Sequence, residues 1–340
     1  MTHLLSDIRI LDELLALHLD IRLWSARRKM SVEDFGGAKL PPEDLASLGS
    51  KRIADPETLR IFGTLKARAF SHLDRHGVRF LSGWAIPEDK AGDIVRELVR
   101  LRDEFQQAKE AFLANYDSSI RDWVDRHSQW SDIIRHSTVG PDYVRARLSF
   151  RWQMYKVAPL MRHDTEQAVL EAGLMEEVQG LGNTLLAEVT RHADDMWRRV
   201  YEGRTEVTHK ALSPLRTLHE KLTGLSFVEP HVAPIADIIR SALDRMPGRG
   251  PIGGTDLLLL QGLVCLLRDS RLLVEHARKL MAGQGTMSVL DSLLTFNDMP
   301  QPDSPSEAAP LQPDELEEAP LLSEIPPLSR GLSIPGMGLW

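Results

Sequence analysis

The chain has 340 residues, 42% of them hydrophobic, and a net charge of -8 at pH 7. This length and apolar content fit a globular protein with one large or two smaller hydrophobic cores. The single cysteine, Cys265, excludes an internal disulfide and a multi-cysteine metal site, and it fits a reducing cytosol.

Neither a membrane span nor a secretory signal is expected. The longest apolar run, Leu257 to Leu267, is interrupted by Gln261 and is shorter than the roughly 18 apolar residues that a span needs. It therefore predicts a buried helix. The first residues lack a basic stretch followed by an apolar one. We expect a soluble, cytoplasmic protein.

The N-terminal part predicts a strand followed by a helix. Over residues 16–25, Leu17, Leu19 and Ile21 alternate with polar side chains, which is the period of a half-buried strand. Pro41-Pro42 and Gly49 are placed to begin and end a short helix. Asp55 is a suitable N-cap for a helix over residues 56–76, and Gly77 is expected to end it in a left-handed conformation.

Two more segments have strand character. Residues 78–86 are short and aromatic and are closed by Pro87, while apolar side chains alternate with polar ones over residues 148–154. Together with residues 16–25, they predict a small three-stranded sheet against which the helices pack.

Two long apolar seams at helical spacing follow. The first comprises Ile94, Leu98, Leu101, Phe105, Ala108, Phe112, Tyr116, Ile120 and Trp123, and the second Leu174, Val178, Leu181, Leu185, Val189, Met196 and Val200. We expect these helices to pair as a long antiparallel hairpin, with the chain returning near Pro159. Shorter helices are predicted over residues 213–225, 232–246 and 254–283, between proline and glycine breakers. The fold class is α+β, mainly α.

Composition predicts three regions. Residues 1–160 form a mixed strand and helix region that includes the first long helix, and residues 161–299 form a helical region. Residues 300–340 are an acidic, proline-rich linker, with seven acidic side chains against Arg330 alone. The linker ends in an apolar peptide with candidate partner-binding residues Leu332, Ile334, Pro335, Met337, Leu339 and Trp340. We expect this peptide to dock in the groove of a partner; folding back onto its own chain is the alternative.

Motifs for catalysis are weak. His72 and His76 stand four residues apart, a spacing that binds zinc on a helix, but no third ligand accompanies them. Residues 248–255 are glycine-rich before a helix, yet they lack the lysine and spacing of a phosphate-binding loop. Acid pairs such as Asp194-Asp195 have the pattern of a solvated helix face. We therefore predict no catalytic residue, no metal and no cofactor, with an unrecognised hydrolase as a remaining alternative.

Basic residues cluster near the ends of several predicted elements. They could converge into a nucleic-acid-binding patch with an aromatic side chain for base stacking, or they could be ordinary surface charge. The candidates are Arg22, Trp24, Arg27, Arg28, Lys29, Lys51, Arg52, Arg79, Arg145, Arg147 and Arg151.

Four local signatures together resemble a known family. They are residues 48–52 before Asp55-Pro56, residues 76–81, Ala85-Ile86-Pro87, and residues 112–116. The combination is similar to an uncharacterised bacterial family of unknown function, over about residues 10–290. The resemblance implies a mobile genetic element (plasmid, integrative element or phage), with genes for a MoxR/CobS-like AAA+ ATPase and a CobT-like von Willebrand factor A protein nearby. It carries over no catalytic residue.

From these observations we expect a non-enzymatic adaptor or structural subunit of an AAA+ ATPase-associated system in conjugation, phage defence or counter-defence. Its partners would be that ATPase and the von Willebrand factor A protein, and it could form oligomers. The alternative is a DNA-binding helper in recombination or DNA transfer that uses the basic residues.

Overall fold

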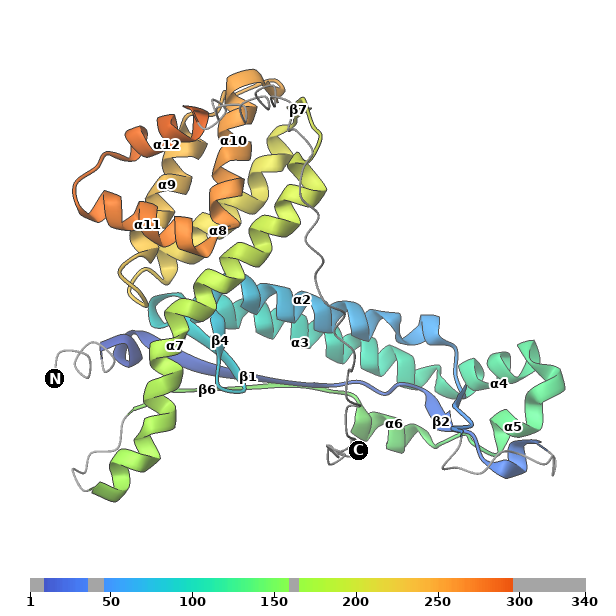
Figure 1. Ribbon diagram of the computed structural model, residues 1–340. Helices are drawn as coiled ribbons and strands as arrows, with labels where there is room; N and C mark the ends of the chain where they lie inside the picture. The colour runs from blue at the N-terminus through green and yellow to red at the C-terminus, as the bar shows by residue number, and fades with distance from the viewer. Residues whose placement is uncertain (1–8, 36–45, 159–164, 296–340) are drawn as a thin grey trace, which may run out of the picture. The chain divides into compact units, whose positions relative to one another are not determined.

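The computed structural model describes residues 9–35, 46–158 and 165–295 (Figure 1). The chain divides into two units, Met1–Asn297 and Asp298–Trp340, and all described residues belong to the first. The described part is mainly helical with small antiparallel sheets, which confirms the predicted fold class. The predicted helix after Pro41 lies largely outside the described residues. The linker and its apolar peptide, Leu332 to Trp340, lie wholly outside them.

The main sheet has four antiparallel strands in the order β4-β5-β1-β6. The central strand β1 (Leu14–Arg22) pairs with β5 (Gly83–Pro87) on one side and β6 (Ser149–Tyr155) on the other. The register sets Leu17 opposite Trp84, and Leu19 opposite Trp152. The alternation that predicted the first and third strands is thus the alternation of the two faces of this sheet.

The prediction of three strands was wrong because residues 78–86 form two strands. Strand β4 (Val78–Phe80) turns back at Leu81 and Ser82 and pairs with β5. Leu81 has a φ of 50°, a left-handed conformation that leucine rarely adopts. Ser82 and Gly83 are usual turn residues, but apolar and aromatic side chains flank them on both sides, so the sequence reads as one continuous strand.

The sheet separates two hydrophobic clusters. Leu17, Trp84 and Ile86 belong to a cluster with α2 (Arg60–His76) and α3 (Ala91–Ala114). Leu14, Ala16 and Ala85 belong to a second cluster with the C-terminal helices. Figure 1 shows α2 and α3 running side by side along the sheet. Around Leu14 to Leu17, each face of the sheet therefore packs against a different group of helices.

The helix predicted over residues 56–76 is confirmed, as a 3-10 turn (Pro56–Leu59) that continues into α2. Asp55 caps it and accepts a hydrogen bond from the backbone N–H of Glu57 at 3.0 Å. The prediction for Gly77 was wrong, since it is extended, with φ -121° and ψ 170°. A Cβ there would lie 2.7 Å from the carbonyl oxygen of Ala85, so a close approach of β5 requires the glycine.

The first seam is buried, but it spans two helices. A 3-10 turn (Glu88–Lys90) precedes α3, and α4 (Tyr116–Arg126) follows after Asn115. The second seam lies on α7 (Thr165–Met196) and on the π-helical segment Trp197–Tyr201. Leu101 of α3 and Leu185 of α7 belong to different hydrophobic clusters. The predicted pairing of the two seams as a long hairpin is therefore not confirmed: α3 packs on α2, and α7 on β4 and α10.

Shorter helices complete the second cluster. All but the last lie close to their predicted bounds, and the last, Thr286–Thr295, was not predicted. They are α8 (Ser213–Gly224), α9 (Val232–Asp244), α10 (Gly254–Leu267), α11 (Ser270–Met281) and α12 (Thr286–Thr295). The helix expected over residues 254–283 is divided at Asp269, whose carboxylate accepts hydrogen bonds from the N–H groups of Arg271 and Leu272 and begins α11. A 3-10 turn, His209–Leu212, precedes α8.

Candidate functional site

A two-stranded basic ribbon is the strongest candidate site in the described chain. It consists of β2 (Arg27–Lys29) and β3 (Ser50–Arg52), which pair antiparallel. Arg27 stands opposite Arg52, and Arg28 opposite Lys51. Five of the predicted nucleic-acid-binding residues are thus brought together: Arg27, Arg28, Lys29, Lys51 and Arg52.

Backbone hydrogen bonds continue the pairing at both ends of the ribbon. The N–H of Ile53 donates to the carbonyl of Ala26 at 2.9 Å, and the N–H of Met30 donates to the carbonyl of Gly49 at 3.1 Å. Ala26 and Gly49 both have positive φ, 52° and 74°. Glycine adopts this conformation without strain, whereas alanine must be held in it by its surroundings. Ala26 is buried, at 2% exposure.

The ribbon is anchored to the protein body on one side. Lys51 pairs with Asp34 of the 3-10 turn Val32–Phe35, and Asp34 also accepts a hydrogen bond from the N–H of Ser31 at 2.8 Å. The hydrogen bond from Lys51 lowers the pKa of Asp34. Trp123 of α4 donates its indole N–H to the carbonyl of Arg52 at 3.3 Å. The ribbon is thus a positioned element.

Three arginines of the ribbon carry its available charge. Arg27, Arg28 and Arg52 are exposed, and within the described ranges none of them has an ion pair with an acidic side chain. Like charges directly opposite each other on paired strands destabilise the pairing. An anion that lies along the ribbon would relieve this repulsion.

The other predicted basic residues lie elsewhere. Arg22 and Arg151, on β1 and β6, both pair with Asp20, at 3.2 and 3.3 Å. Arg145 and Arg147 are exposed on α6 (Pro141–Arg147). Arg79 on β4 pairs with Asp74 at 3.0 Å and stacks on Trp84 at 4.0 Å. The structure therefore does not gather all of these residues into one patch.

Trp24 is unsuited to the base stacking that we expected of it. Its side chain is 9% exposed and packs against Phe112 and Tyr116, with ring centroids 6.3 and 6.0 Å away. A tryptophan held in this way contributes to the hydrophobic cluster around α3 and offers no free face to a base.

His72 and His76 do share a helix face, with ring centroids 5.0 Å apart. They line a cavity of about 770 Å³ together with His219 and several carboxylates. Burial lowers the pKa of both imidazoles. Across the described ranges, no group of three or more His, Cys, Asp or Glu side chains is arranged to hold a metal ion.

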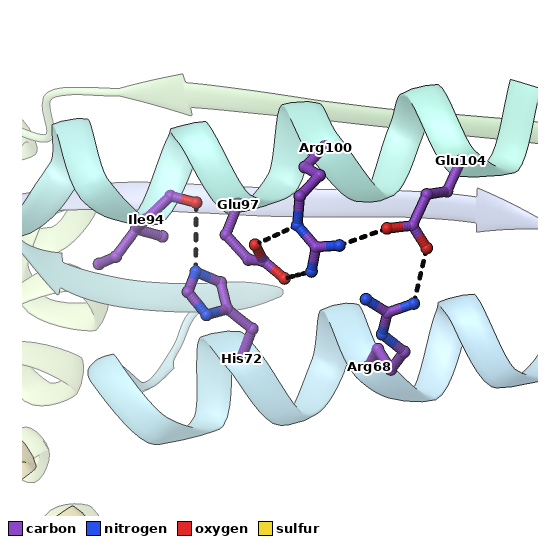
Figure 2. A network of polar contacts seen from close by, with 6 residues as sticks. All are labelled: Arg68, His72, Ile94, Glu97, Arg100 and Glu104. Carbon is purple, nitrogen blue, oxygen red and sulfur yellow. Dashed lines mark hydrogen bonds and ion pairs between the residues drawn. The ribbon is translucent and has the colours of Figure 1, made fainter.

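The surroundings of His72 connect α2 with α3 (Figure 2). His72 Nε2 lies 3.2 Å from the carbonyl oxygen of Ile94. Nearby, Arg100 bridges Glu97 and Glu104 on α3, and Arg68 of α2 pairs with Glu104 at 2.7 Å. This network joins two helices across their polar edges, which is a structural role.

Two further motifs have structural explanations. Within the glycine-rich segment, β8 (Ile252–Gly253) pairs with β7 (Glu206–Val207) immediately before α10. Asp194 accepts ion pairs from Arg198 at 2.6 Å and from Arg268 at 2.8 Å.

Sequence analysis missed several residues that shape the molecule's basic surfaces. Asp34 and Trp123 position the ribbon, and Arg102 and Lys109 of α3 line a cavity with Arg151. Arg102 and Lys109 occupy α3 positions outside the apolar seam. A helical projection of α3 shows that both residues lie off its apolar face. It does not show which strand they face, because that depends on tertiary packing.

The chain matches a protein family over most of its length. Residues 11–269 match the family described as a protein of unknown function (DUF3150). The chain belongs to this family. No curated protein and no solved structure matches it. In the described part of the chain, no helix is both long and apolar enough to cross a membrane.

Proposed function

We propose that this member of the family is a non-enzymatic binding subunit whose basic ribbon contacts the phosphate backbone of a nucleic acid. The observation that carries the proposal is the pairing of β2 with β3, which holds Arg27 opposite Arg52 and Arg28 opposite Lys51. Guanidinium groups suit phosphate because they form two parallel charge-assisted hydrogen bonds.

The geometry favours contact with the backbone over reading of bases. Trp24, the aromatic residue closest in sequence to the ribbon, is buried, and the ribbon itself carries only serine and basic side chains. Phosphate contacts position a protein on nucleic acid without sequence preference. A helper in recombination or DNA transfer is one role that such binding would serve.

The test is fluorescence anisotropy with a labelled DNA duplex and the matching single strand. Replacing Arg27, Arg28 and Arg52 together by alanine should weaken binding at low salt by at least about tenfold, because each removes a phosphate contact. In the control variant, Arg198, Arg199 and Arg204 are replaced by alanine, which removes the same charge at another place in the chain. This variant should bind like the wild type. An equal loss of affinity in both variants would show that net charge alone determines binding, and it would overturn the proposal.

A second proposal is an adaptor or structural subunit of an AAA+ ATPase-associated mobile-element system, acting in the cytoplasm in conjugation, defence or counter-defence. Its support is the family membership, on which the expectation of a MoxR/CobS-like ATPase and a von Willebrand factor A partner rests, and the exposed strand edge described below.

Co-purification with a MoxR/CobS-like ATPase encoded beside the chain's own gene tests this second proposal. Association at micromolar concentration, strengthened or weakened by an ATP analogue, is the expected result. Deleting residues 329–340 should weaken it if the apolar peptide is the docking segment. No association with or without nucleotide would overturn the proposal.

A further inference from the structure

The two edges of the main sheet differ in how they are covered. Edge strand β4 has three residues and packs against α7, where the Glu188 carboxylate accepts a hydrogen bond from the N–H of Arg79 at 3.4 Å. Strand β6 is the last strand at the other end and has seven residues. In the described ranges no strand pairs with its outer edge. The N–H and C=O groups of alternate residues on such an edge are available to another strand.

A groove runs beside this edge. One cavity of about 320 Å³ lies between α3 and the start of β6, and a second of about 540 Å³ continues around the strand to β1. Arg102, Phe150 and Arg151 line both cavities. An edge strand beside a helix, with a groove between them, is the arrangement in which an extended peptide adds a strand to a sheet.

The far end of β6 is apolar and exposed. Met154 and Tyr155, the last two residues of β6, are 40% and 41% exposed, although Phe150 of the same strand is buried. Exposed apolar side chains on an open edge promote association with another chain. This end of the strand edge, beyond the two cavities, therefore suits apolar side chains.

The near end of the groove is basic. Arg102, Lys109 and Arg151 line it, and two of them already have partners, since Arg102 pairs with Asp103 at 2.8 Å and Arg151 with Asp20 at 3.3 Å. Lys109 donates a hydrogen bond to the carbonyl of Leu148 at 2.7 Å, and both burial and the nearby Arg145 lower its pKa. The buried Ser149 hydroxyl, which also lines the groove, has no hydrogen-bond partner in the described part of the chain. These three cations outnumber the carboxylates of Asp20 and Asp103 in the groove, so a peptide carboxylate would complement the remaining positive charge and could accept a hydrogen bond from Ser149.

We propose that the outer edge of β6 docks an extended peptide segment of a partner protein, which pairs with β6 as a fifth strand and carries carboxylates opposite Arg102, Lys109 and Arg151. A second copy of this chain is a poorer occupant, because two copies would bring these cations close together. The site shares no residue with the basic ribbon, so it goes beyond nucleic-acid binding and can fail independently of it.

Selection of displayed random octapeptides on the full-length chain, followed by anisotropy with the enriched peptides, tests the proposal. Enriched peptides should alternate β-branched or aromatic residues with Asp or Glu and should lack proline. Arg102→Glu combined with Arg151→Glu should weaken their binding by about tenfold or more. The control Arg121→Glu, an exposed arginine on α4, should leave it unchanged.

Backbone pairing has its own readout, which does not depend on the variants folding. Methylating the amide nitrogens of alternate residues in an enriched peptide should abolish binding in one of the two registers, and bound peptide should slow amide exchange over residues 149–155. Failure to enrich any peptide, enrichment of basic or helical peptides, or indifference to N-methylation would overturn the proposal. Dimerisation that the Arg102→Glu and Arg151→Glu changes strengthen would assign the edge to a second copy and overturn it as well.

Discussion

A buried ion pair joins the two hydrophobic clusters at the level of single residues. Lys221 of α8 donates to Glu188 of α7 at 2.6 Å and to the carbonyl of Asp74 at the end of α2 at 2.7 Å. The Lys221 and Glu188 side chains are 2% and 12% exposed. A charge buried this deeply is tolerated because a partner and hydrogen bonds replace its hydration.

Glu188→Gln should therefore lower the free energy of unfolding by about 3–5 kcal/mol, since it leaves the ammonium of Lys221 without a countercharge. Urea denaturation monitored by circular dichroism measures this. Glu176→Gln, on the exposed face of the same helix, is the matched control and should change stability by less than about 0.5 kcal/mol. Similar stability of the two variants would show that the pair contributes little.

Three histidines, of which His72 and His76 are partly buried, give the fold an expected pH dependence. Burial lowers the pKa of His72, His76 and His192 below the ordinary value of 6.5. Below pH 6.5 the unfolded chain then binds more protons than the folded chain, so stability is full above this pH and is lost as the pH falls. The melting temperature should decrease between about pH 7 and pH 5.

The variant His72→Gln with His76→Gln should decrease less steeply over the same range, because two of the three groups no longer titrate. Differential scanning calorimetry at several pH values measures the slope. The exposed His136 provides a control, since His136→Gln should leave the slope as in the wild type. A slope that is unaffected by the double change would contradict the assignment to these histidines.

At the scale of elements, the turn between β4 and β5 depends on Gly83. A Cβ at this position would lie 2.1 Å from the carbonyl oxygen of Leu17 on β1. Gly83→Ala should therefore force the strands apart and cost about 1–3 kcal/mol of stability. Gly92→Ala is the matched control, because Gly92 lies in α3 with no atom within 4 Å of the added Cβ. It should stabilise by about 0.5–1 kcal/mol. Equal thermal shifts would contradict the close approach.

Helices and strands with a regular pattern of apolar residues could be predicted from the sequence. Turns and helix breaks that depend on one or two residues could not. The alternation from Leu17 to Arg22 and the seam around Leu101 predicted β1 and α3, because one face of α3 and one face of this part of β1 are buried. The turn at Leu81 was missed because its turn-forming residues, Ser82 and Gly83, lie within a continuous apolar and aromatic run. The break between α10 and α11 was missed because Asp269, which caps α11, follows an apolar run that continues the helical pattern.

The candidate site was predictable only as a set of charges. The sequence showed two basic clusters, Arg27 to Lys29 and Lys51 with Arg52. It did not show that they pair, because neither strand has the alternation of apolar and polar residues that identifies a strand. Pairing is imposed from outside the ribbon, by Asp34 and Trp123. For the same reason, the wrong expectation for Trp24 could be corrected only from its packing against Phe112.

In the described unit as a whole, the main sheet lies between two hydrophobic clusters of helices. The face around Leu17 is buried by α2 and α3, and the face around Leu14 by α7 and the helices that follow. The two seams looked like partners in the sequence because both are long and apolar, a property that does not identify which surface each one buries. The ribbon and the β6 edge lie outside this framework and are the two proposed binding surfaces.

The salt dependence of DNA affinity is the most direct test of the proposal that the ribbon binds nucleic acid through phosphate contacts. Between about 50 and 200 mM salt, the logarithm of the association constant should fall linearly with the logarithm of the salt concentration, with a slope of about -0.9 for each contact. The variant lacking the Arg27, Arg28 and Arg52 side chains should have a slope smaller in magnitude by about 2 to 3. A wild-type slope in that variant, or wild-type affinity that does not change with salt, would contradict the account.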